Sequence, residues 1–136
     1  MTRVINTIRR SHGLRPLIVS SRLSAAAAQH TQEMGDDGYF AHESHNGSAF
    51  WKRIEHWYPS AGWNSWEVGE NLLYSAPYTS ATDAITTWMK SPPHRENILD
   101  PSWREIGIAA IHFDDAPGAY RNAPVTIVTA DFGMRH

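Results

Sequence analysis

The first third of the chain carries apolar residues at helical spacing. Near the N-terminus they repeat three and four residues apart, at Val4, Ile5 and Ile8. Gly13 is placed to end that segment, and Ser20 or Ser21 can cap a second helix that runs to the turn at 35–38. The apolar stripe of this second helix consists of Leu23, Ala26, Ala27, His30 and Met34. The pattern predicts two amphipathic helices joined by an extended connection.

The middle of the chain holds two further helical patterns and one segment without a period. A short helix is predicted over 48–57, because three apolar residues share one face: Phe50, Ile54 and Trp57. Residues 80–83 resemble a capping box, so another helix is expected from there to about Lys90. Residues 59–77 between these helices have no clean period, and we expect a long irregular segment there.

The last third of the chain predicts strands. Residues 105–113 and 125–132 are two alternating runs rich in β-branched side chains. Residues 114–124 read as a long loop, so the two runs are expected to pair as an antiparallel hairpin. With helices first, strands last and no repeats or linkers, the pattern predicts one α+β domain over residues 1–136.

Composition narrows the possible functions. The 136 residues include 12 Lys and Arg against 14 Asp and Glu, a formal charge of -2, so no basic face for nucleic acid is expected. The lack of cysteine excludes disulfides, thiolate catalysis and cysteine-based zinc sites. No stretch approaches the ~20 apolar residues of a membrane span, so no transmembrane segment is expected. The basic N-terminus shows no signal peptide, which predicts either a cytosolic chain or a mature domain cut from a longer precursor.

Two of the eight histidines directly follow a break in secondary structure. His42 follows the turn at 35–38, and His94 follows a double proline. Glu70 lies between them in the sequence, after Gly69, which allows close approach of the backbone. Two imidazoles and one carboxylate are the ligand set of many catalytic zinc sites, and they also suit general acid–base chemistry. From spacing alone, three scattered polar residues remain the alternative, since no HExxH motif is present.

The other histidines have simpler interpretations. His30 lies on the apolar stripe of the second helix, where a hydrogen-bonded core histidine is favoured over a ligand. His45 precedes Asn46-Gly47, which predicts a turn tip in water. His112 has no assigned side of its predicted strand. Surface exposure is expected for His12, His56 and His136.

Five segments of the chain, in this order, resemble a known family: LRPLIVSSRLSAAAAQHTQEM, GYFAHES, VGENLLY, WMKSPPHRENIL and EIGIAAI. They resemble the CAP domain of cysteine-rich secretory proteins, antigen 5 and pathogenesis-related 1 proteins, also called the SCP domain, and most of all its cysteine-free bacterial branch. The likeness runs from about Val4 to Gly133. It implies a three-layer α-β-α sandwich, in which helices flank a small antiparallel sheet and a shallow cleft opens on one side.

Members of this family carry two histidines and two acidic residues in the cleft. By the resemblance, His42 in FAHES, Glu70 in GEN and His94 in PPHREN match three of these four positions. The second acid of the family follows a tryptophan in a W-x-x-E pattern, and here that position is Ser91, so the tetrad is reduced to a triad. Three other acidic residues are candidates to replace it in space: Glu43, Glu67 and Asp131.

The resemblance implies a secreted or extracytoplasmic binding module, located outside the cell or in the cell envelope. Its cleft is expected to hold a divalent metal ion, Zn²⁺ first, through His42, Glu70 and His94, together with a small apolar, glycan or peptide ligand. The first alternative is a metal-dependent, peptidase-like hydrolase in which Glu70 is the general base. The second alternative is a structural role, in which the three side chains form a buried hydrogen-bonded network.

Overall fold

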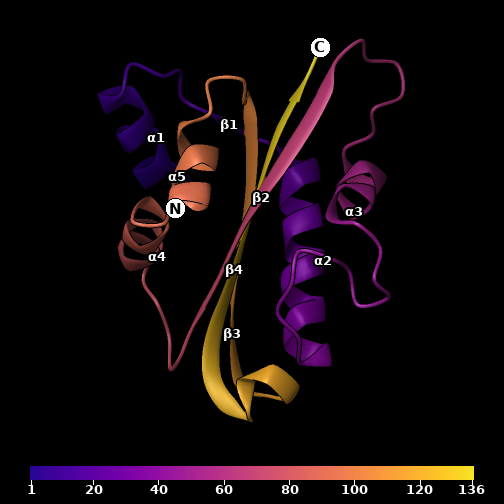
Figure 1. Cartoon of the computed structure of the whole chain (residues 1–136), viewed down its shortest axis with the longest axis vertical. Helices are drawn as coiled ribbons and strands as arrows, with labels where there is room; N and C mark the ends of the chain where they lie inside the picture. Colours follow the sequence, from indigo (N-terminus) through magenta and orange to yellow (C-terminus); the bar gives the residue numbers. More distant parts are fainter.

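The computed structural model describes residues 1–136 and is built around a four-stranded sheet (Figure 1). The strands lie in the order β1-β3-β4-β2, and their bounds are Ile18–Val19, Glu105–Ala116, Ala123–Arg135 and Trp66–Ser75. β4 pairs antiparallel with both β3 and β2, whereas the short β1 pairs parallel with β3. The predicted small antiparallel sheet is confirmed, with one parallel pair at the β1 edge.

β3 and β4 form the antiparallel hairpin that the two alternating runs predict. Their register pairs Glu105 with Gly133 and Phe113 with Val125. The expected long loop is wrong, because an irregularity between Phe113 and Ala116 lets the strands continue past the alternating runs. The remaining connection holds only a single 3-10 turn, η1, at Gly118–Tyr120.

β2 corrects the expectation that residues 59–77 are irregular. Trp66–Ser75 pairs with β4 along its whole length. The sequence of this strand shows no alternation of apolar and polar residues, because residues 69–72 are all buried. Two of these buried residues, Glu70 and Asn71, are polar. The expected order of helices first and strands last is also wrong, since β1 and β2 lie between helices in the sequence.

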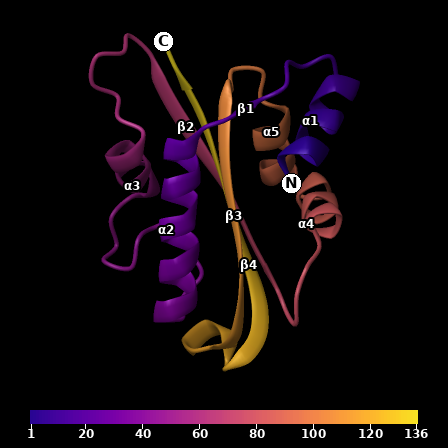
Figure 2. The same cartoon turned by 180° about the vertical axis from the view of Figure 1, so that it is seen from behind.

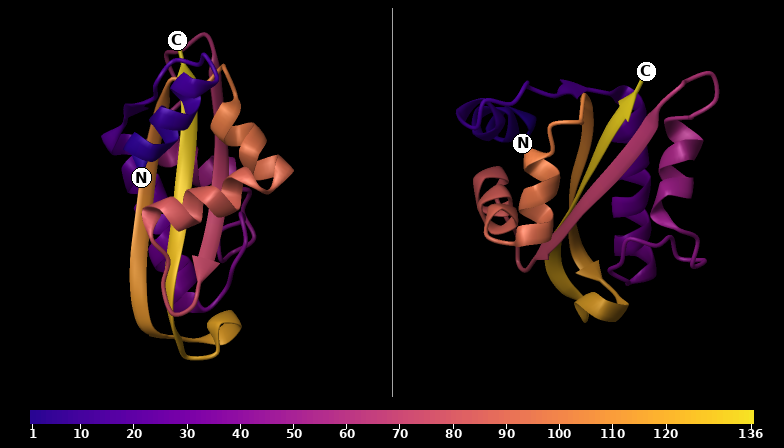
Figure 3. Two further views of the ribbon diagram at one scale, coloured as in Figure 1. Left: turned by 90° about the vertical axis from the view of Figure 1, so that its left-hand side faces the viewer. Right: turned by 45° about the horizontal axis from the view of Figure 1, so that its top comes forward.

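Helices cover both faces of the sheet: α1 (Thr2–Ser11), α2 (Ser21–Asp37), α3 (Phe50–Trp57), α4 (Ala81–Met89) and α5 (Pro92–Leu99). α2 and α3 lie on one face, and α1, α4 and α5 lie on the other (Figures 1 and 2). The tilted view in Figure 3 shows the same three layers, which confirms the α-β-α sandwich. None of these helices has both the length and the apolarity needed to cross a membrane.

Local signals explain where the helices begin. Ser20 and Ser80 each accept, through the side-chain oxygen, the N–H of the residue three positions further on, so both predicted caps are confirmed. α3 begins at Phe50, two residues later than the pattern predicts. Pro92 and Pro93 occupy the first two positions of α5. Proline has no N–H group, and at these positions an N–H would make no hydrogen bond within the helix, so proline costs nothing there.

Each face of the sheet has its own apolar core. Toward α1, α4 and α5 the core consists of Ile5, Leu17, Ile85, Trp88, Ile98, Trp103, Ile106, Val128, Ala130 and Phe132. Toward α2 and α3 it includes Leu23, Ala26, Met34, Ile54, Tyr58, Leu72, Val125 and Ile127. Successive residues of β4 alternate between these cores, as the period of a strand requires, so β4 is the central strand of the fold.

Gly107 marks the closest approach of α2 to β3. A Cβ atom at this position would lie 2.1 Å from the carbonyl carbon of Leu23 and from the nitrogen of Ser24, which are backbone atoms that cannot swing aside.

We therefore expect Gly107→Ala to lower the free energy of unfolding by about 3 kcal/mol, measured by urea denaturation. Ala110→Ser, at an exposed position of the same strand, should change it by less than about 0.5 kcal/mol. Equal stability of the two variants would contradict this close packing.

Candidate functional site

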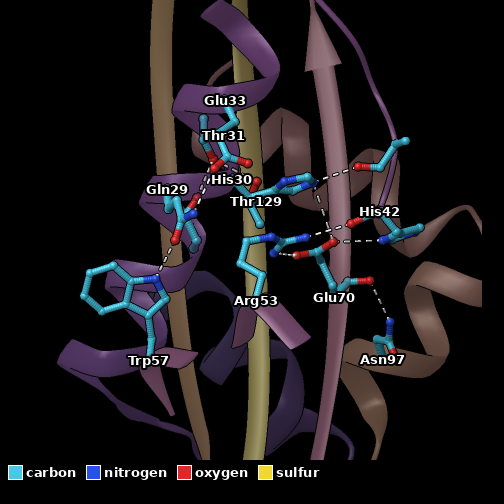
Figure 4. Close-up of polar contacts among 12 residues, drawn as sticks. Gln29, His30, Thr31, Glu33, His42, Arg53, Trp57, Glu70, Asn97 and Thr129 are labelled. Atoms are coloured by element: carbon cyan, nitrogen blue, oxygen red, sulfur yellow. Dashed lines mark hydrogen bonds and ion pairs between the residues drawn. The ribbon is translucent and has the colours of Figure 1, made fainter. Parts of the chain in front are cut away.

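Glu70 is the centre of a polar network on the edge strand β2 (Figure 4). Its side chain is 0% exposed. Oε1 accepts a hydrogen bond from Nδ1 of His42 at 3.0 Å, and Oε2 accepts one from Nη1 of Arg53 at 2.8 Å. Nη2 of Arg53 donates to the carbonyl oxygen of His42 at 2.7 Å. Glu70 and Arg53 together therefore hold the chain at His42 against the sheet.

His30 and Asp131 complete this network as neutral groups. Nε2 of His30 donates to the carbonyl of Ala41 at 2.7 Å and lies 3.9 Å from Oε1 of Glu70. Burial lowers the pKa of His30, so the predicted hydrogen-bonded core histidine is confirmed as a neutral one. Asp131 lies opposite Glu70 in the pairing of β2 with β4, and both of its carboxyl oxygens are buried beside that of Glu70. Burial and the charge of Glu70 raise the pKa of Asp131 well above its ordinary value, which favours the protonated form.

Glu70 keeps its negative charge although it is buried. Burial by itself raises the pKa of Glu70, but the hydrogen bond from His42 acts in the opposite direction. The carboxyl of Asp131 and the charge of Arg53 add to this effect, and the pKa of Glu70 falls from 4.5 to about 2. The same hydrogen bond raises the pKa of His42. The core of the network is therefore a balanced pair of charges on Glu70 and Arg53.

His94 approaches the same edge of the sheet from the other helical layer. It lies in the first turn of α5, with Nδ1 2.7 Å from Oγ of Ser91, the residue that precedes the helix. Its ring stacks on Trp88, with centroids 6.5 Å apart and an interplanar angle of 17°. Burial, followed by the charge of His42, lowers the pKa of His94. The double proline thus begins a new helix with His94 at its start, as the sequence predicts.

Two asparagines tie α5 to β2. Nδ2 of Asn97 donates to the carbonyl oxygen of Glu70 at 3.2 Å and to Oδ1 of Asn71 at 2.8 Å. Nδ2 of Asn71 donates to the carbonyl oxygen of His94 at 3.0 Å. These bonds fix the position of His94 relative to Glu70.

Two hollows lie along this edge, and we call them together the cleft. The first, of about 540 Å³, contains His42 and Glu70 and has apolar walls formed by Phe50, Val68 and Trp103. The second, of about 260 Å³, contains His94 and Ser91 beside an apolar wall of Phe40, Leu72, Leu73, Tyr74 and Trp88. The structure therefore brings His42 and Glu70 into direct contact, and it places His94 in the second hollow.

The acidic candidates for the fourth cleft residue lie in different places. Asp131 lies opposite Glu70 on the buried side. Glu43 lines the first hollow but is exposed, and Glu67 is exposed on β2. None of them contacts His94, whose Nδ1 is bonded by Ser91. The position where the family pattern has an acid thus carries a hydroxyl that still bonds the histidine.

Few donor atoms in the cleft are free of protein hydrogen bonds. His42 and His94 each have Nδ1 occupied, by Glu70 and Ser91, so Nε2 is the nitrogen left for a ligand. Both oxygens of Glu70 already accept hydrogen bonds. No group of three or more His, Asp or Glu side chains is arranged to hold a metal ion. These donor atoms do not make a closed structural zinc site, which takes four protein ligands.

The sequence interpretation missed Arg53 and Asn71. Arg53 lies on the buried face of α3, and a charged residue on an apolar face is a signal of a buried partner. Asn71 directly follows Glu70, and nothing in the apolar pattern marks it as buried. Among the remaining histidines, the predicted exposure is confirmed for His12, His45, His56 and His136, and His112 is exposed as well.

Comparison with known proteins identifies relatives over most of the chain. A model of the cysteine-rich secretory protein family (CAP) matches residues 2–132. The uncharacterized protein YkwD of Bacillus subtilis is 31% identical over 106 residues, which make up 78% of this chain and 39% of YkwD.

Solved structures with the same fold come from other bacteria. An extracellular protein of Bacillus anthracis that contains an SCP domain has a TM-score of 0.72 and 24% identity, covering 95% of this chain and 37% of that protein. An outer surface protein of Borrelia burgdorferi has a TM-score of 0.77 and 20% identity, covering 99% of this chain and 90% of that protein. The chain thus spans about two fifths of YkwD and of the Bacillus anthracis protein.

Glu70→Gln tests the charge at the centre of the network. The amide keeps the shape of the side chain but leaves buried Arg53 without a counter-charge, so we expect a loss of about 3 kcal/mol in the free energy of unfolding at neutral pH. The pKa of Glu70 is lowered from 4.5 to about 2 in the folded protein, so its contribution is complete above pH 4.5 and is lost as the pH falls toward 2. The stability difference from wild type, measured by urea denaturation, should shrink over that range.

The matched control is Glu67→Gln, at an exposed position of the same strand. It should change the free energy of unfolding by less than about 0.5 kcal/mol at neutral pH. A difference between wild type and Glu70→Gln that stays constant down to pH 2 would show that Glu70 is not a depressed, ion-paired carboxylate.

Proposed function

This chain belongs to the cysteine-rich secretory protein (CAP) family, and from that premise we propose that it is an extracytoplasmic binding module whose cleft takes a divalent metal ion and a small ligand. The observation that carries the proposal is that His42 and His94, on the same edge of the sheet, each keep Nε2 available for a ligand. The relatives described as an extracellular protein and as an outer surface protein support a location outside the cytoplasm.

The metal ligands in this proposal are the Nε2 atoms of His42 and His94. Zinc sites in proteins commonly use imidazole nitrogen, and a hydrogen bond on the other ring nitrogen orients the ligand. Glu70 provides that bond for His42, and Ser91 provides it for His94. Direct binding of the ion by Glu70 stays a prediction, because it requires Glu70 to share an oxygen with His42 or Arg53. A bound Zn²⁺ would supply a Lewis-acidic centre that is open to a ligand oxygen.

The walls of the cleft favour a ligand with an apolar part, either a small apolar molecule or a peptide, over a glycan in this position. Phe40 and Tyr74 border the second hollow, are 38% and 45% exposed, and pack edge to face at 4.8 Å. Exposed aromatic rings next to a polar centre are typical of ligand sites that bury an apolar group and orient it by a few polar contacts. In this arrangement, the apolar part of the ligand lies against the aromatic wall and its polar end lies at the histidines.

The hydrolase alternative has less support from the geometry. A general base works best with a pKa near the operating pH, whereas the pKa of Glu70 is about 2. Both oxygens of Glu70 also have hydrogen-bond donors within the protein. The structural alternative describes Glu70 and Arg53 well, but it does not account for His94, which lies in the second hollow and is bonded to Ser91.

Calorimetric titration with Zn²⁺ tests the metal part of the proposal. Wild type should bind, and His42→Ala and His94→Ala should each weaken binding by more than about tenfold, because each removes one of two protein ligands. His56→Ala, at an exposed histidine on α3, is the matched control and should leave the affinity unchanged. Equal heats for wild type and for the double variant would remove the metal ion from the proposal.

Ser91→Asp tests how the second histidine is oriented. A carboxylate beside Nδ1 favours the imidazolium, so the pKa of His94 should rise above that of wild type. The same change should strengthen zinc binding, because a carboxylate is a stronger partner for a ligating histidine than a hydroxyl. The pKa is measured by NMR titration of the imidazole, with Ser91→Ala as the control that only removes the bond. An unchanged pKa in Ser91→Asp would show that Ser91 does not position His94.

A further inference from the structure

The edge of β2 has backbone groups that the protein leaves unpaired beside the cleft. β4 is the one neighbour of β2 in the sheet. On the other side of β2, the carbonyl oxygens of Glu70 and Leu72 accept hydrogen bonds from the side chains of Asn97 and Trp88, and Figure 4 shows the bond to Glu70. Alternate residues of a strand point their N–H and C=O groups to the same side, so those of Val68 also point away from β4. No other part of the protein forms a hydrogen bond with them.

The first hollow surrounds this part of the strand edge. Its lining includes Phe50 of α3 on one face of the sheet, and Asn97 and Trp103 on the other face. It also includes two successive residues of β2, Val68 and Gly69. Because successive residues of a strand face opposite sides of the sheet, a hollow lined by both of them extends around the edge of the strand. The unpaired groups of Val68 therefore face the space in which a ligand lies.

Unpaired groups on a strand edge are complementary to the backbone of another extended chain. In β-strand addition, main-chain hydrogen bonds provide affinity, and contacts to alternate side chains provide specificity. An added strand places its successive side chains on the two faces of the sheet, and here each face has an apolar wall, Phe50 on one and Trp103 on the other. A compact apolar molecule lies against one wall only and leaves the backbone of Val68 unpaired.

The charged groups of the first hollow favour a basic ligand over an acidic one. The lining includes the carboxylates of Glu43 and Glu70 and contains no lysine or arginine. Glu70 is paired with His42 and Arg53, whereas Glu43 is exposed and forms no ion pair. Glu67, on the same strand, is exposed as well. The unpaired charge along the open edge is thus negative, so charge complementarity favours Lys or Arg beside the apolar residues of the ligand.

We infer that the open edge of β2 at Val68 binds an extended peptide segment with apolar and basic residues, by β-strand addition. The inference rests on the proposed function, because it names the class of ligand that the cleft takes, but it requires no metal ion. The N–H and C=O groups of Val68 bond the backbone of the segment. Two successive apolar side chains of the segment lie against Phe50 and Trp103. The bond from Asn97 to the carbonyl oxygen of Glu70 ends the open stretch, so the pairing is short.

Titration of the ¹⁵N-labelled full chain with the peptide acetyl-Lys-Val-Ile-Val-Lys-amide, in buffer with EDTA, tests this inference by NMR. The amide proton of Val68 should shift downfield, because it gains a hydrogen-bond acceptor. Its exchange with solvent should slow at least about tenfold in the complex. An unchanged Val68 signal at the highest peptide concentration, or shifts confined to other parts of the surface, would overturn the inference.

The matched control peptide has the same side chains, with a methyl group on the amide nitrogens of its three central residues. It cannot donate to the carbonyl oxygen of Val68, so we expect it to bind at least about fivefold more weakly. Equal affinity of the two peptides would show that side chains alone hold the ligand, which contradicts strand addition.

The double variant Glu43→Gln/Glu67→Gln tests the charge of the site. It removes the two exposed carboxylates and should weaken binding of the lysine peptide at least about threefold at low salt. Glu96→Gln, exposed on α5, is the matched control and should bind like wild type. Equal affinity of the double variant and wild type would contradict the assignment to a basic segment.

Titration of the same sample with Zn²⁺, after removal of EDTA, separates this inference from the metal part of the proposed function. Peptide pairing at Val68 in a protein that binds no zinc would support the strand site and remove the metal ion. Zinc binding in a protein whose Val68 signal does not respond to the peptide would support the metal ion and overturn the strand site.

Discussion

The buried ion pair between Glu70 and Arg53 is the interaction on which the site depends. It joins the edge strand β2 to α3, and the remaining terminal nitrogen of Arg53 fixes the carbonyl of His42. Removal of one member of such a pair leaves an uncompensated charge in the interior, which costs more than the pair itself contributes. The protein keeps the balance by surrounding the pair with the neutral side chains of His30 and Asp131.

The edge position of β2 explains why a cleft forms at this place. An edge strand leaves backbone groups that the fold must cover, and here side chains of α4 and α5 bond the carbonyl oxygens of Leu72 and Glu70. The two helical layers therefore meet at this edge, one carrying His42 before α3 and the other carrying His94 on α5.

Much of the fold could be predicted from the sequence, because apolar periods mark α2 and the β3–β4 hairpin and because serine caps mark α2 and α4. β2 could not be predicted, because its buried residues Glu70 and Asn71 are polar. They form hydrogen bonds and do not continue an apolar stripe that the sequence would show. The motif pattern placed His42 and Glu70 correctly as neighbours. Their partner Arg53 follows from the way α3 packs across the sheet, and a single sequence does not encode that contact as a local pattern.

The most direct test of this account is the carboxyl titration of Glu70 and Asp131, followed by NMR of ¹³C-labelled protein. The account predicts a midpoint near pH 2 for Glu70, with Asp131 still protonated when Glu70 ionises. A midpoint for Glu70 at its ordinary value of 4.5, or ionisation of Asp131 before Glu70, would contradict the buried ion pair at the centre of the site.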